Sequence, residues 1–170
     1  AVAYGNGFQN GYRGNDLSGT GWGNKWDFII VHESGHEWFG NNITAKDMAD
    51  NWIHEGITNY MESLYIDCAS GKDKAATYSK GEWSRIYNND PVIPDYGVNN
   101  MPTGDMYNKG AAIMYMIRQM TNNDDHFREM LRVLNKEFYH STVTTAQVEE
   151  YIAKATGLNL TAFFNQYLRT

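Results

Sequence analysis

The sequence has few cysteines and prolines, and it contains no long hydrophobic run. Its one cysteine, Cys68, excludes an internal disulfide and a zinc site built from several cysteines, so a metal ion would need histidine and carboxylate ligands. No apolar segment approaches the roughly 20 residues that span a bilayer, so we expect no membrane span. The composition does not distinguish an exported protein from a cytoplasmic one.

Positive charge is also scarce. The 14 Lys and Arg residues are outnumbered by 20 Asp and Glu residues, which gives a formal net charge of −6 and a pI near 5.3. The basic residues are scattered along the chain, whereas proteins that bind the nucleic-acid backbone present a basic patch or stripe. We therefore expect no nucleic-acid partner.

The length of 170 residues and the hydrophobic fraction of 42% are typical of one compact domain. Residues 1–25 are rich in Gly and Asn with interspersed aromatics, a composition that favours turns and permits at most short strands. Residues 26–170 show helical periodicity through most of their length. The sequence thus predicts a mainly α-helical fold with a loop-rich lead-in.

Several helices are predicted from the spacing of apolar residues. The first is expected to begin at Trp26, with Asp27 in its first turn, and to stop at Gly40. The second is expected to begin after Thr44, whose hydroxyl could cap it, and the third covers residues 72–87. A long loop with the three prolines follows, and the remaining apolar stripes indicate three or four more helices.

The clearest chemical signal is the run His32-Glu33-Ser34-Gly35-His36. On a helix, side chains four residues apart lie one turn apart on the same face, so His32 and His36 can direct ring nitrogens at one metal ion. Glu33 projects about 100° further round the helix, where a general base can take a proton from a water that the metal activates. This pattern is a recognised metalloprotease signature.

Two histidines leave a catalytic zinc ion short of one protein ligand, because such sites use three protein ligands and one open position. One large group of zinc peptidases uses a third His six residues after the second, with Gly three after it, but those positions hold Asn42 and Phe39. Another group uses a Glu on the following helix, and Glu55 comes after 18 intervening residues. The expected ligands of one zinc ion are His32, His36 and Glu55.

Four segments carry a resemblance to a known family. Residues 38–41 match the Trp-Phe-Gly-Asn run that follows the family's second His, and residues 52–56 match its Trp-x-x-Glu-Gly segment at the same spacing of 18. Residues 107–110 match its Tyr-x-Lys-Gly run, and residues 163–167 match the Phe-Phe-x-x-Trp-like segment near the end of its catalytic domain. The chain resembles the M1 family of zinc aminopeptidases, gluzincins of the leukotriene A4 hydrolase and aminopeptidase N type, over nearly its whole length.

The resemblance implies the helical lobe of a thermolysin-like zincin catalytic domain, and it implies roles for two more residues. Tyr107 occupies the position of the tyrosine that stabilises the oxyanion in the transition state. Glu62 resembles the carboxylate that holds a ligand histidine by its other ring nitrogen. The implied activity is hydrolysis of N-terminal peptide bonds through a zinc-activated water, with Glu33 as general base and a peptide or protein as substrate.

Two departures from the family pattern limit this interpretation. His54 replaces the usual Asn before the third ligand, and we interpret it as a neighbour of the site, because adjacent positions on a helix diverge. The family's Gly-x-Met-Glu-Asn motif, whose Glu binds the free amino group of the substrate, does not occur in the sequence. We therefore expect residues 1–170 to form one partial catalytic domain, cut after that motif and without the flanking domains of its parent protein. Such a chain would bind zinc but cleave substrates weakly or not at all.

Two other functions stay open at the level of sequence. A non-catalytic zinc-binding or interaction module would need the metal ligands but neither Glu33 nor Tyr107, so the presence of both favours an enzyme. An endopeptidase of thermolysin type would use the same ligand set, with a different spacing to the Glu and no anchor for a free amino group. The residue preference for a substrate is not indicated.

Overall fold

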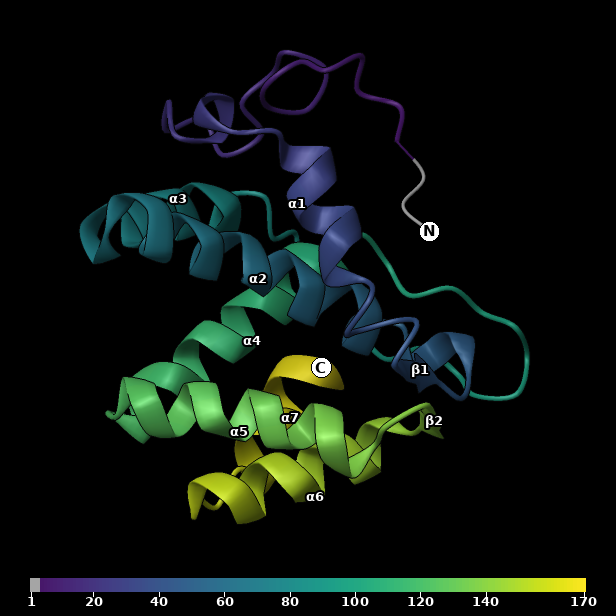
Figure 1. Cartoon of the computed structure of the whole chain (residues 1–170). Helices are drawn as coiled ribbons and strands as arrows, with labels where there is room; N and C mark the ends of the chain where they lie inside the picture. The colour runs from purple at the N-terminus through teal and green to yellow at the C-terminus, as the bar shows by residue number, and fades with distance from the viewer. Residues whose placement is uncertain (1–3) are drawn as a thin grey trace.

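The computed structural model describes residues 4–170, and these form a helical chain with one small parallel ladder (Figure 1). The α-helices of this part are α1 (Phe28–Gly35), α2 (Trp52–Ser70), α3 (Lys72–Trp83), α4 (Asp105–Thr121), α5 (Asp124–Glu137), α6 (Thr145–Thr156) and α7 (Thr161–Leu168). Short 3-10 helices are η1 (Gly23–Lys25) and η2 (Met48–Asp50). The strands β1 (Ile43–Ala45) and β2 (Ser141–Val143) pair in parallel. The predicted mainly α-helical fold is confirmed.

The first two predicted helix boundaries differ from the structure. Helix α1 begins at Phe28 because the carboxylate of Asp27 caps it, accepting a hydrogen bond from the Ile30 N–H at 3.2 Å. It ends at Gly35, and the chain continues to Gly40 through turns. Thr44 does not cap a helix: it lies in β1, and its hydroxyl donates to the Gly40 carbonyl oxygen at 2.7 Å.

The third predicted helix is too long at its end. Helix α3 stops at Trp83, because the backbone N–H groups of Tyr87 and Asn88 donate to the carboxylate of Asp105 at 2.9 and 2.7 Å. This carboxylate lies at the start of α4, so it fixes the chain where it leaves α3. Residues 4–25 contain no strand, only an isolated bridge between Tyr12 and Asn15, and residues 1–3 lie outside the described part of the chain.

Helix α2 lies at the centre of the fold and packs against α1, α3 and α4 (Figure 1). It crosses α4 at two glycines: a Cβ on Gly110 would lie 2.7 Å from the Cα of Gly56, so no other residue fits at this crossing. Helix α1 approaches α2 at Gly35, where a Cβ would lie 2.8 Å from Cγ2 of Thr58. The three helices that carry the motifs are therefore held in close contact at small residues.

The main apolar core joins α2 and α4 to the C-terminal helices α5, α6 and α7. Trp52 at the start of α2 is fully buried in it, and its indole N–H donates to the hydroxyl of Thr145 at 2.8 Å. A second cluster attaches the lead-in to α2 and α3, and consists of Trp26, Ile66, Ala75 and Tyr78. Within residues 4–170 the structure contains no helix of the length and apolar character needed to cross a bilayer.

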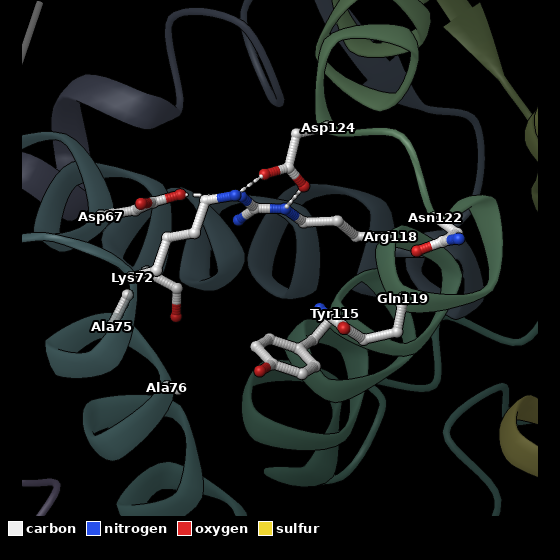
Figure 2. A pocket seen from close by; sticks show the side chains of 10 residues that line it. Asp67, Lys72, Ala75, Ala76, Tyr115, Arg118, Gln119, Asn122 and Asp124 are labelled. Carbon is white, nitrogen blue, oxygen red and sulfur yellow. Dashed lines mark hydrogen bonds and ion pairs between the residues drawn. The ribbon is translucent and has the colours of Figure 1, made fainter.

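The buried guanidinium of Arg118 links helices α2, α4 and α5. Arg118 of α4 donates to Asp67 of α2 at 2.8 Å and to Asp124 of α5 at 2.8 Å (Figure 2). Asp124 also pairs with Lys72 at the start of α3. These groups line a polar pocket of about 400 Å³, in which the charged side chains are paired with one another. The network therefore connects α2, α3, α4 and α5.

Candidate metal centre

The three predicted ligands meet where α1 approaches α2. His32 lies in the last turn of α1, His36 directly follows the helix, and Glu55 lies in the first turn of α2. Oε2 of Glu55 is 3.3 Å from Nε2 of His32 and 3.3 Å from Nε2 of His36. One ligand atom from each residue lies within 4.8 Å of the others, so the group could hold a metal ion.

The donor set fits zinc. Zinc accepts imidazole nitrogens and carboxylate oxygens at about 2.0–2.2 Å, and two such atoms around a tetrahedral ion lie roughly 3.3 Å apart. This separation agrees with the distances from the Glu55 oxygen to the two histidine nitrogens. His32, His36 and Glu55 thus fit one zinc ion, and three protein ligands leave a fourth position open.

The second ring nitrogen of His32 has a buried carboxylate as its partner. Nδ1 of His32 lies 2.8 Å from Oε1 of Glu62, which is 0% exposed. The other oxygen of Glu62 accepts a hydrogen bond from the hydroxyl of Tyr78 on α3 at 2.5 Å. This chain of contacts fixes the His32 ring with Nε2 toward Glu55. The contact between Glu62 and His32 is the one that the sequence resemblance implied.

The other two histidines near the site are also oriented by hydrogen bonds. Nδ1 of His36 donates to the carbonyl oxygen of Phe39 at 3.0 Å, so its Nε2 is the nitrogen directed at Glu55 and available to a metal ion. Nε2 of His54 accepts a hydrogen bond from the Ala45 N–H at 2.7 Å. Burial lowers the pKa of His54, with the nearby His36 acting in the same direction. His54 therefore contacts the β1 backbone, consistent with the neighbour that the sequence predicted.

The carboxylates of the group favour positive charge on its histidines. Burial acts to lower the pKa of His32, but hydrogen bonds to Glu55 and Glu62 outweigh it and raise the pKa to about 10. Burial acts to raise the pKa of Glu55, but hydrogen bonds from His32 and His36 lower it to about 2. A metal ion would take the place of the protons that these carboxylates otherwise hold on the imidazoles.

Glu33 and Tyr107 lie on the wall of a cavity of about 360 Å³ that also includes His32. The ring centroids of His32 and Tyr107 are 6.1 Å apart. Burial, then the charges of Glu55 and Glu33, raise the pKa of Tyr107 to about 12, so its phenol keeps its proton and can donate a hydrogen bond. Tyr107 lies one turn before Gly110, so the close crossing of α2 and α4 brings it to the site.

The sequence did not single out several polar residues of this cavity. Asn59, Glu82 and Arg85 line it together with the motif residues. Asn59 follows Glu55 by four positions on the same helix, and this spacing could have placed it beside the site. Glu82 and Arg85 come from the end of α3 and the turn after it, and no spacing in the sequence relates them to the metal ligands.

Comparison with known proteins identifies the family of this chain. The family model of the peptidase family M1 domain matches residues 23–167. The chain belongs to peptidase family M1. Among curated M1 relatives, endoplasmic reticulum aminopeptidase 1 of Mus musculus is 28% identical over 124 residues, which are 67% of this chain and 13% of that protein. The same protein of Homo sapiens is 27% identical over 123 residues, 66% of this chain and 13% of its own length.

Solved M1 structures share the fold. An M1 zinc metallopeptidase mutant of Deinococcus radiodurans, bound to a Tyr-Ser-Ala substrate, superposes with a TM-score of 0.73 at 19% identity, covering 86% of this chain and 33% of that one. Yeast leukotriene A4 hydrolase in complex with bestatin gives a TM-score of 0.71 at 20% identity, covering 82% of this chain and 25% of that one. The family resemblance seen in the sequence is confirmed, and the chain spans only a part of the length of these M1 proteins.

Proposed function

We propose that this chain is the metal-binding helical part of an M1 aminopeptidase catalytic site. His32, His36 and Glu55 hold one zinc ion, and the site hydrolyses the N-terminal peptide bond of a peptide or protein. The observation that carries the proposal is the position of the Glu55 oxygen, 3.3 Å from Nε2 of both histidines. Glu62, hydrogen-bonded to Nδ1 of His32, keeps that ligand ring in place.

Bound zinc would supply a Lewis acid that acidifies a water and polarises the scissile carbonyl. Glu33, half-buried on the cavity wall beside His32, accepts a proton from the attacking water on its carboxylate and passes it to the leaving amine. Tyr107, protonated at neutral pH, donates a hydrogen bond to the carbonyl oxygen as negative charge develops there. That bond is stronger in the transition state than in the substrate, so it accelerates the reaction.

We also propose that these residues act as one partial catalytic domain. The M1 relatives are much longer, with the chain matching 13% of their length. The Gly-x-Met-Glu-Asn motif that binds the substrate amino group in the family is not within these 170 residues. We therefore expect the chain by itself to bind zinc and to hydrolyse aminoacyl substrates weakly.

Zinc binding is tested by titrating the EDTA-treated chain with zinc. We expect one ion per chain and a loss of affinity of at least about 100-fold in Glu55→Gln and in His36→Gln, since each removes one of three ligands. His126→Gln is the matched control, because His126 is exposed on α5. Unchanged zinc affinity in Glu55→Gln would refute the ligand set.

Hydrolysis is tested separately with leucine 4-nitroanilide. Any turnover should disappear in Glu33→Gln while the zinc content stays at one ion per chain, because Glu33 moves protons and does not hold the metal. Turnover that persists in this variant would refute the role of Glu33 as general base, whereas zinc binding with no turnover in the full-length parent protein would favour a non-catalytic zinc module. Peptides with free and acetylated N-termini separate an aminopeptidase from an endopeptidase, since only the latter accepts the acetylated form.

A further inference from the structure

The cavity beside the metal centre is lined by a buried carboxylate, and one oxygen of this carboxylate has no hydrogen-bond partner within the described residues. Glu82 of α3 is 3% exposed, and its Oε1 has no hydrogen-bond partner within the described residues. Its Oε2 lies 3.7 Å from Nη1 of Arg85. Both side chains line the same cavity as His32, Glu33 and Tyr107. Glu82 therefore belongs to the wall of the space next to the reacting groups, and its unpaired oxygen is buried in that wall.

An unpaired buried carboxylate oxygen is costly, and native proteins rarely leave one without a partner. Burial is the main cause that raises the pKa of Glu82 to about 8; the charge of Glu62 adds to it, and Arg85 opposes it. The surroundings of Glu82 within the chain thus do not compensate its charge. A hydrogen-bond donor on a bound molecule would compensate this charge.

The cavity has the composition expected for a long side chain with a charged end. Its walls include the aromatic and aliphatic residues Tyr12, Leu17, Phe28, Ile29 and Tyr87. Asn59, 4% exposed, adds an amide that can donate and accept. Two carboxylates, those of Glu33 and Glu82, line the cavity together with the guanidinium of Arg85 and the ring of His32. Lysine and arginine pack their alkyl stems on apolar surface and pair the charged end with a carboxylate.

We propose that this cavity binds a basic side chain of the substrate, lysine or arginine, and that Glu82 is the partner of its charged end. The proposal rests on the proposed function in one respect, namely that the bound molecule is a peptide whose scissile bond lies at the metal centre. Glu82 then sets the preference for a residue near that bond.

The test compares two probes of the same shape. N-acetyl-L-arginine amide and N-acetyl-L-citrulline amide differ in the charge of the side chain, and their blocked ends remove any contribution from terminal charges. The whole chain is titrated with each probe, with and without zinc, and the dissociation constant is read from amide chemical shifts. We expect arginine to bind at least about tenfold more tightly at pH 8.5, the size of a charged hydrogen bond.

Three variants identify the residue responsible. Glu82→Gln keeps the shape of the side chain and should abolish the preference for arginine. Glu150→Gln removes a carboxylate that is exposed on α6, and should leave the preference intact. Arg85→Gln removes the guanidinium that competes for Glu82, and should tighten arginine binding. Because Arg85 is partly exposed, this variant keeps the proposal testable if Glu82→Gln fails to fold.

The pH dependence separates a binding role from a structural one. Arginine requires the ionised form of Glu82, so its affinity should rise between pH 6 and about pH 8 and then level off, because the pKa in the empty cavity is about 8. Citrulline affinity, and arginine affinity in Glu82→Gln, should not follow this curve. A residue that only supports the fold would not produce it.

Several results would overturn the proposal. Equal affinities for the two probes, a preference that survives in Glu82→Gln, or no binding of either probe would each do so. Zinc content measured in the same samples keeps this proposal apart from the proposed function. Zinc binding without a preference for arginine refutes only the role of Glu82. A preference for arginine without zinc binding refutes only the metal centre.

Discussion

Gly56 and Gly110 face each other at the crossing of α2 and α4, where a Cβ on Gly110 would lie 2.7 Å from the Cα of Gly56. Gly56 directly follows Glu55, and Gly110 lies one turn after Tyr107. One backbone contact therefore sets the distance between a proposed metal ligand and a proposed oxyanion donor. This contact is a physical reason for glycine at the end of both family segments, residues 52–56 and residues 107–110.

Gly110→Ala should destabilise the chain, because its methyl group would force the two helix backbones apart. We expect a loss of about 1–3 kcal/mol, which lowers the midpoint of thermal unfolding by several degrees. Gly104→Ala is the matched control, since a Cβ there meets no atom within 4 Å. Equal midpoints for the two variants would show that the close crossing is not required.

Glu62→Gln should lower zinc affinity by about 10–100-fold, the usual cost of removing a carboxylate that orients a ligand histidine. The substitution keeps the shape of a side chain that is 0% exposed and removes the charge from the contact with His32. Tyr78→Phe should have a smaller effect, because it removes one hydrogen bond to the carboxylate and not the carboxylate itself. The measurement is a competitive zinc titration, and affinities in the reverse order would contradict the proposed arrangement.

The stability of the chain should depend on pH through Glu82. Its pKa is raised from 4.5 to about 8 in the folded state, so folding favours the protonated form. This contribution is present in full below about pH 4.5, and it is lost as the pH rises through about 8. Glu82→Gln removes the titration, so the variant should gain stability relative to wild type between pH 5 and pH 9, on the order of 1–4 kcal/mol.

Urea unfolding of both proteins at several pH values measures this difference. Glu150→Gln serves again as control, because an exposed carboxylate should give a difference that hardly changes with pH. If the free energies of unfolding of Glu82→Gln and wild type differ by the same amount at every pH in this range, the pKa of Glu82 is not raised by folding.

Arg118→Met should be strongly destabilising, because among residues 4–170 it leaves the buried carboxylate of Asp67 with only the ion pair to Arg128 at 3.1 Å. Breaking one partner of a buried ion pair costs about 3–5 kcal/mol. Arg132→Met is the control: it breaks an exposed pair with Glu129, and such pairs contribute about 0–1 kcal/mol. Denaturant unfolding distinguishes the two, and similar losses would show that the Arg118 network does not hold α2, α4 and α5 together.

Local features of the chain were predictable because they depend on neighbouring residues. The spacing of His32 and His36 places both rings on one face of a turn, and the periodic stripes predicted the C-terminal helices. The errors occurred where distant contacts decide the local structure. Thr44 lies in a strand because β1 pairs with β2, nearly 100 residues later, and α3 ends early because Asp105 binds the backbone that follows it.

By itself the sequence determined which residues could bind a metal, since helix geometry and ligand chemistry are contained in the motif and the family segments. Only the tertiary structure decided what surrounds them. The packing of α3 against α2 brings Tyr78 to Glu62 and Glu82 to the cavity, and neither contact follows from spacing along the chain. Packing, which depends on the shapes of side chains far apart in sequence, placed the carboxylate that we expect to select the substrate.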